Sequence, residues 1–128
     1  LALPLQPFRG QIEAPVPGAV TVAFGSAPSS DGIELAATAG EPVHAIHEGT
    51  VTFAGDLQGL GTLIIVDHGD QTFSHYGFLA SLAVQEGLHV DARTELGTAG
   101  RSPSGTPSVY FELRIDGRPV DPVEWLRR

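Results

Sequence analysis

Glycine and proline are spread along the whole 128-residue chain, and this constrains the fold more than any other feature. There are 16 glycines and 10 prolines. Proline interrupts helices, and both residues favour tight turns. Their even distribution therefore predicts many short strands joined by turns, with little room for long helices. The sequence indicates an all-β fold.

Alternating and β-branched apolar segments give the expected strands. These strands are expected at residues 21–24, 33–37, 42–46, 50–55, 61–67, 72–78 and 109–115. Residues 26–32 are expected to be rich in turns, and residues 79–84 to form a turn or a short helical passage. Asp116-Gly117 is a typical hairpin turn. Asp121 as N-cap with Pro122 at the first helical position predicts one short C-terminal helical turn.

Charge and composition exclude several classes of function. The formal net charge is −8, so the surface should repel nucleic acid, whose binding depends on clustered basic residues. All seven basic residues are arginine, which excludes Schiff-base chemistry and a P-loop lysine. Cysteine is absent, which excludes disulfides and thiolate metal sites.

The beginning of the chain differs from the rest. No apolar run approaches the roughly 20 residues that cross a bilayer, and the segment after Leu1 lacks the basic region of a signal peptide. Proline is frequent there. We therefore expect a fragment or processed product with a linker or N-terminal extension at residues 1–15, followed by one domain at residues 16–128.

An ordered set of short motifs runs from Val16 to Leu126. The motifs are Phe24-Gly25, Ser30-Asp31-Gly32-Ile33-Glu34, Gly40-Glu41-Pro42-Val43-His44-Ala45, Gly49-Thr50-Val51, 61–69, Tyr76-Gly77-Phe78-Leu79, 97–102, 107–112 and 117–122. Together they resemble the LytM or lysostaphin type of zinc-dependent peptidoglycan endopeptidases. The resemblance implies two packed antiparallel sheets, partly barrel-like, of the duplicated hybrid motif type. It also implies a site in a groove along one sheet.

The resemblance implies that catalytic zinc would be held at the positions of Ser30, Glu34 and Tyr110. Serine is a poor zinc ligand, and tyrosine must first lose a proton with a pKa of about 10, so only glutamate is a plausible replacement. The two remaining histidine positions of the family hold Phe78 and Ser108, which offer no acid or base near neutral pH. We therefore expect no catalytic residue, no metal, no cofactor and no hydrolysis at this site.

Two alternatives stay open from the residues. The five histidines, His44, His47, His68, His75 and His89, could form an unorthodox metal site, although their spacing favours surface or hydrogen-bonded roles. The aromatic residues Tyr76, Phe78 and Tyr110 either pack in the interior or line a groove that binds a partner.

Family members without the zinc histidines resemble the EnvC and NlpD type. This implies a periplasmic or otherwise extracytoplasmic domain that binds and activates a zinc-dependent N-acetylmuramoyl-L-alanine amidase when the septal wall is split in cell division. Further implied partners are peptidoglycan and, through an upstream region, a membrane division complex. The alternatives are a peptidoglycan-binding module without hydrolysis and a residual metallo-endopeptidase. The expected partner-binding groove is lined by Ser30, Glu34, Tyr76, Phe78, Arg101, Ser108 and Tyr110.

Overall fold

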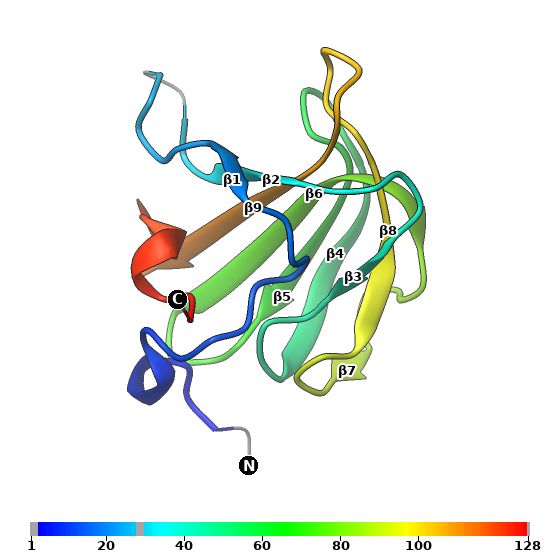
Figure 1. Cartoon of the computed structure of the whole chain (residues 1–128). Coiled ribbons are helices and arrows are strands. Elements are labelled where there is room, and N and C mark those ends of the chain that lie inside the picture. Colours follow the sequence, from blue (N-terminus) through cyan, green and yellow to red (C-terminus); the bar gives the residue numbers. More distant parts are fainter. Residues whose placement is uncertain (1–2, 28–29, 128) are drawn as a thin grey trace.

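The computed structural model describes residues 3–27 and 30–127, and its regular structure consists almost entirely of strands (Figure 1). The strands are β1 (Val20–Val22), β2 (Ile33–Ala36), β3 (Pro42–His44), β4 (Gly49–Leu57), β5 (Gly61–Asp67), β6 (Thr72–Leu82), β7 (His89–Val90), β8 (Glu95–Arg101), β9 (Pro107–Ile115) and β10 (Arg118–Val120). Two 3-10 turns, η1 (Gln6–Phe8) and η2 (Pro122–Glu124), complete it. Among the described residues, no helix has the length and apolar character needed to span a membrane. Residues 28 and 29, within the expected turn region, lie outside the described residues, as do residues 1, 2 and 128.

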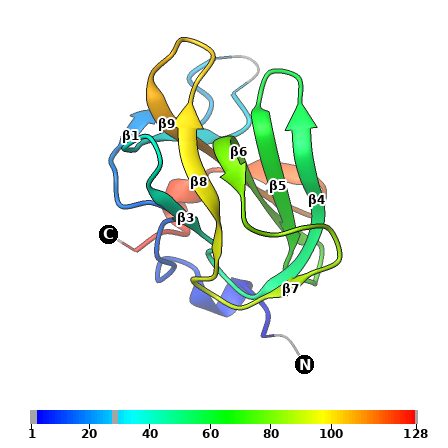
Figure 2. The ribbon, with the colours of Figure 1, turned by 90° about the vertical axis from the view of Figure 1, so that its right-hand side faces the viewer.

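Hydrogen bonds join the ten strands into one antiparallel sheet that curls over its core (Figures 1 and 2). The order is β1-β2-β9-β8-β6-β5-β4-β7, with β10 beside β9 and β3 beside β8. The all-β prediction is confirmed, as is the short C-terminal turn, where the Asp121 carboxylate accepts from the Val123 amide. We expected two packed sheets; the hydrogen bonding is continuous because β9 pairs with both β8 and β6.

A bend at Phe78 allows this continuity. Before the bend, Thr72–Gly77 of β6 pairs with β9, and after it Leu79–Leu82 pairs with β8. Phe78 has a φ of 62°, a value that non-glycine residues rarely adopt. Its amide donates to the Leu60 carbonyl at 2.8 Å. The pairing with β5 shifts register at the same place, as expected for a bulge that bends a strand.

The expected turn or helical passage at residues 79–84 is wrong over most of its length. β6 continues through Leu82 because the bend redirects the strand to a new partner instead of ending it. β8 was not expected at all.

The core lies inside the curl, and both ends of the chain cover it. Leu5 and Ile12 are buried in the same cluster as Trp125 and Leu126, and Ile12 forms a parallel bridge with Leu126. Residues 3–15, expected as a linker or extension, therefore pack against the domain over much of their length. The boundary at residue 15 stays a prediction.

A chain of polar groups crosses this core beside His68. Nδ1 of His68 lies 2.8 Å from the Glu48 carbonyl, and Nε2 lies 2.6 Å from the Ser74 hydroxyl. The Ser74 and Tyr76 hydroxyls are 2.7 Å apart, and Tyr76 accepts from the Ile46 amide at 3.1 Å. Because a carbonyl only accepts, Nδ1 of neutral His68 carries the proton. Burial lowers the pKa of His68 to about 4.

This pKa makes the stability of the fold depend on pH. The unfolded chain binds a proton at His68 below about pH 6.5, whereas the folded chain binds it only near pH 4. Stability is therefore lost as pH falls through this window, by about 2 kcal/mol from His68 at pH 5. We expect His68→Gln to show a correspondingly smaller loss between pH 7 and pH 5 in urea unfolding. His44→Gln, in β3 outside the network, is the matched control, and an equal pH dependence in wild type and His68→Gln would contradict the prediction.

Candidate functional site

Successive side chains of β9 alternate between the core and the opposite, outer face of the sheet. Val109, Phe111 and Leu113 are fully buried in the core. The outer face of β9 carries Ser108, Tyr110, Glu112 and Arg114. On the neighbouring strands, Tyr110 is paired with Glu34 of β2 and with Gly77 of β6. Three of the positions predicted for the site, Glu34, Phe78 and Tyr110, therefore come together around one ring.

The Tyr110 ring is held by close packing on two sides. Its centroid lies 5.8 Å from that of Phe78, with the rings tilted by 55°, a favourable aromatic arrangement. Gly32, just before β2, leaves the space into which the ring fits: a Cβ there would lie 2.8 Å from Cζ of Tyr110 and 2.5 Å from the Phe111 carbonyl oxygen. The absence of a side chain at Gly32 thus sets the position of the phenol.

The Tyr110 hydroxyl begins a chain of charged hydrogen bonds. It donates to Oε1 of Glu112 at 2.5 Å, and Nε of Arg114 donates to Oε2 of the same carboxylate. Arg114 also forms an ion pair with Asp31 at 3.6 Å. Glu112 is only 3% exposed, so both of its oxygens require these donors. The Tyr110 hydroxyl is therefore committed to a structural contact.

The pKa shifts at this face oppose acid-base chemistry by the phenol. Burial, together with the hydrogen bond and negative charge of Glu112, raises the pKa of Tyr110 far above its usual value. The hydrogen bond to Glu112 raises the pKa of Arg114, and burial raises the pKa of Glu34. Tyr110 stays a neutral donor, and Arg114 a cation.

The other predicted site residues have different surroundings. Ser108 is buried, and its hydroxyl donates to the Thr106 carbonyl at 3.1 Å. Arg101, exposed at the end of β8, donates to the Gly105 carbonyl at 2.9 Å. Ser30 is half-buried two residues before Gly32. No contact between Ser30 or Arg101 and Tyr110 is among those that the structure describes.

Tyr76 corrects one prediction. The family resemblance of the Tyr76-Gly77-Phe78-Leu79 motif led us to expect it in the groove with Phe78, and residues two apart on a regular strand do share a face. The bulge at Phe78 breaks this alternation: Tyr76 is fully buried, with its ring centroid 5.6 Å from that of Phe111 on the core side of β9. Phe78 lies against Tyr110 on the other side. Tyr76 is a core residue here.

The residues at the family's zinc positions do not fit a zinc ion. Tyr110 keeps its proton and donates it to Glu112, Ser30 offers a neutral hydroxyl, and only Glu34 is an ordinary ligand. Among the described residues, the group of three metal-type side chains that lie close together is elsewhere and does not include Glu34.

Sequence reasoning missed four residues that shape this face. Glu112 and Arg114 could have been found, because period-two alternation along the strand predicted at 109–115 places them on the same side as Tyr110. His75 is paired with Glu112 where β6 lies beside β9, and it could not have been found without knowing the register of these strands. The Asp31 to Arg114 ion pair joins segments far apart in sequence and left no local signal.

Known proteins resemble the chain in both sequence and structure. The profile of peptidase family M23 matches residues 28–122. The murein hydrolase activator EnvC of Escherichia coli K12 is 37% identical over 125 residues, covering 94% of this chain and 30% of EnvC. The murein hydrolase activator NlpD of the same strain is 32% identical over 114 residues, covering 88% of this chain and 30% of NlpD.

Among solved structures, a mutant catalytic domain of the prophage-encoded M23 protein EnpA from Enterococcus faecalis superposes with a TM-score of 0.74 at 30% identity. The match covers 85% of this chain and 94% of that domain. The first curated relatives are much longer than this chain, which spans 21% to 33% of their lengths.

The packing of Tyr110 over Gly32 gives a stability test. Gly32→Ala places a methyl group against the Phe111 carbonyl and the Tyr110 ring, and we expect a loss of about 2 kcal/mol in the free energy of unfolding. Gly55→Ala in β4 is the matched control: its Cβ would lie 3.5 Å from Phe53, an ordinary contact, and the change should be below about 1 kcal/mol. Urea unfolding measures both. Equal stability of Gly32→Ala and wild type would mean that Tyr110 is not held by this contact.

Proposed function

The chain belongs to peptidase family M23, and from this membership we propose that it is a non-catalytic member that binds and activates a cell-wall amidase. Its partner is a zinc-dependent N-acetylmuramoyl-L-alanine amidase that splits septal peptidoglycan. Relatives named as murein hydrolase activators support this role. We place the domain outside the cytoplasm, in the periplasm, with links to a membrane division complex through a region upstream of this chain.

One observation carries the proposal: the hydrogen-bonded series of Tyr110, Glu112 and Arg114 on the outer face. At the position where the resemblance implies a zinc-binding histidine, Tyr110 presents a protonated phenol bonded to a buried carboxylate. Activation of water by zinc needs several ligands and an open coordination position. These residues supply a rigid surface instead, and a rigid, partly exposed aromatic ring is a good anchor for a protein partner.

The proposed partner-binding surface centres on Tyr110. We include in it the partly exposed Glu34 and Ser30, the exposed Arg101 and the buried Ser108, together with Phe78, whose buried ring packs on Tyr110. Asp31 adds an exposed carboxylate that is already paired with Arg114. We expect the amidase to contribute an apolar group to the Tyr110 ring and a hydrogen-bond donor or cation to Glu34.

Dye release from labelled sacculi tests activation directly. The purified chain alone should release no dye, an amidase from the same cell little, and the two together several times more. Absence of stimulation with every amidase of that cell would contradict the proposal. Sedimentation of the chain with sacculi, without stimulation, would favour the peptidoglycan-binding alternative. Metal-dependent release by the chain alone would favour a residual endopeptidase.

Tyr110 offers the sharpest variant in this assay. Tyr110→Ala removes the ring and the hydroxyl that donates to Oε1 of Glu112, while Arg114 still pairs with that carboxylate. We expect a lower free energy of unfolding. In protein that circular dichroism shows to be folded, stimulation at subsaturating concentration should fall by about tenfold or more. Tyr110→Phe keeps the ring and should retain most of the stimulation. Leu88→Ala, at an exposed residue just before β7, is the matched control. Full stimulation by folded Tyr110→Ala would place the partner on another surface.

A further inference from the structure

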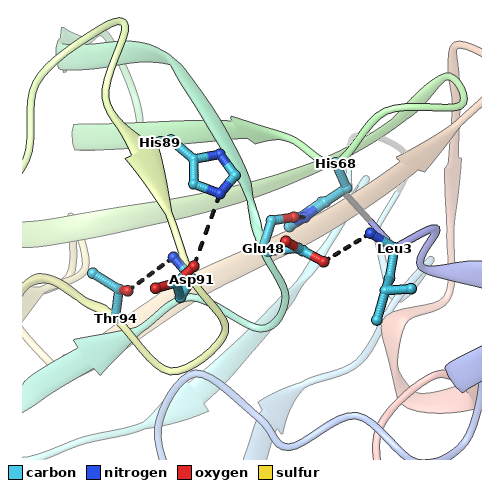
Figure 3. Close-up of polar contacts among 6 residues, drawn as sticks. All are labelled: Leu3, Glu48, His68, His89, Asp91 and Thr94. Atoms are coloured by element: carbon cyan, nitrogen blue, oxygen red, sulfur yellow. Dashed lines mark hydrogen bonds and ion pairs between the residues drawn. The ribbon is translucent and has the colours of Figure 1, made fainter. Parts of the chain in front are cut away.

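The pairing of β7 with β4, at the end of the sheet beyond β5, brings three potential metal ligands together (Figure 3). Gly49 is paired with Val90 and Thr50 with His89, so the same register places Glu48 opposite Asp91. His89 and Asp91 are two residues apart and therefore project to the same side. Ligand atoms of Glu48, His89 and Asp91 all lie within 4.8 Å of one another. These residues belong to none of the contacts around Tyr110.

The charges in this cluster are not balanced by arginine. Ion pairs of arginine within the described part of the chain involve Glu13, Asp31, Glu112 and Glu124, but neither Glu48 nor Asp91. Within the cluster, Nε2 of His89 lies 3.8 Å from Oδ1 of Asp91. Like charges directly opposite each other destabilise a strand pair. A bound cation would remove this repulsion.

Contacts from outside the cluster hold two of its members. Oε1 of Glu48 accepts a hydrogen bond from the Leu3 amide at 2.7 Å. The Glu48 carbonyl accepts another from Nδ1 of buried His68 (Figure 3). The Asp91 amide donates to the Thr94 hydroxyl at 3.1 Å, which fixes the turn after β7 with the carboxylate facing His89. Glu48 and Asp91 also line an open depression of about 510 Å³, together with Arg93 and Arg127, and the Asp91 side chain is 87% exposed, so water reaches the cluster.

We propose that Glu48, His89 and Asp91 bind a divalent transition-metal ion, such as Zn²⁺, that fastens β7 to β4. One imidazole nitrogen with two carboxylates suits Zn²⁺ better than Mg²⁺ or Ca²⁺, which prefer oxygen ligands alone. Water completes the coordination, as is usual for zinc sites with three protein ligands. The ion is structural: β7 is two residues long and, among the described residues, pairs with β4 alone, so a further link would strengthen its attachment.

Calorimetric titration of the metal-stripped chain with Zn²⁺ at neutral pH tests the proposal. We expect saturable binding of one equivalent, and little heat with Mg²⁺. His89→Ala and Asp91→Asn should each weaken Zn²⁺ binding by about tenfold or more. Asp56→Asn is the matched control, because it makes the same charge change at the far end of β4, where the new amide oxygen can still accept from Thr62.

A second measurement links binding to β7. The Val51 amide donates to the Leu88 carbonyl next to β7 at 2.9 Å, so Zn²⁺ should slow hydrogen exchange at Val51 and raise the melting temperature of wild type but not of Asp91→Asn. The Asp91 side chain is 87% exposed, so this isosteric variant should fold even where His89→Ala does not.

Absence of saturable Zn²⁺ binding, or wild-type affinity in folded Asp91→Asn, would overturn the proposal. Binding that is lost in Glu34→Gln instead would place the ion at the family's zinc position. That result would contradict both this site and the non-catalytic role, whereas loss in Asp91→Asn alone leaves the amidase proposal untouched.

Discussion

The bend of β6 at Phe78 is the constraint on which the rest of the structure depends. It lets one strand pair with β9 before the bend and with β8 after it, so a single sheet curls over the core. The positive φ of Phe78 is unfavourable for an aromatic residue, and its neighbours stabilise it. The Phe78 amide donates a hydrogen bond to the Leu60 carbonyl, and the Phe78 ring packs on Tyr110. The bend also separates Tyr76 from Phe78, sending one ring into the core and the other to the outer face.

The outer face depends in turn on a buried carboxylate. Removing Glu112 from water is costly, and it is stabilised only because Tyr110 and Arg114 both donate to it. Arg114 is itself tied to Asp31 before β2, so the network crosses from β9 to the segment that enters β2. A metal at the family position would join these same elements. In this chain, hydrogen bonds and the packing of Tyr110 on Gly32 make that connection.

Much of the fold could be predicted from sequence. The predictions that failed have a common cause. The strand predicted at 61–67 is β5 with the same limits, and the predicted Asp121 cap is present. β8 was missed because Gly97 and Gly100 resemble loop residues. They are glycine because strands approach closely: a Cβ at Gly97 would lie 2.1 Å from the Ser81 carbonyl oxygen, and one at Gly100 would lie 2.5 Å from that of Phe78. Sequence alone does not separate this use of glycine from a turn.

The same limit applies to the candidate site. Glu34, Phe78 and Tyr110 could be matched to family positions. The face on which Tyr76 lies depends on the bulge at Phe78, which no short sequence pattern predicts. Charge distribution shows a similar dependence on register. Seven arginines stand against fifteen acidic residues, so arginine is scarce, and strand pairing decides which carboxylates meet one. Glu112 meets Arg114 and is stabilised by a cation from its own strand. Glu48 meets Asp91, and neither is in an arginine ion pair among the described residues, so an external cation at the β4 to β7 edge would relieve their repulsion.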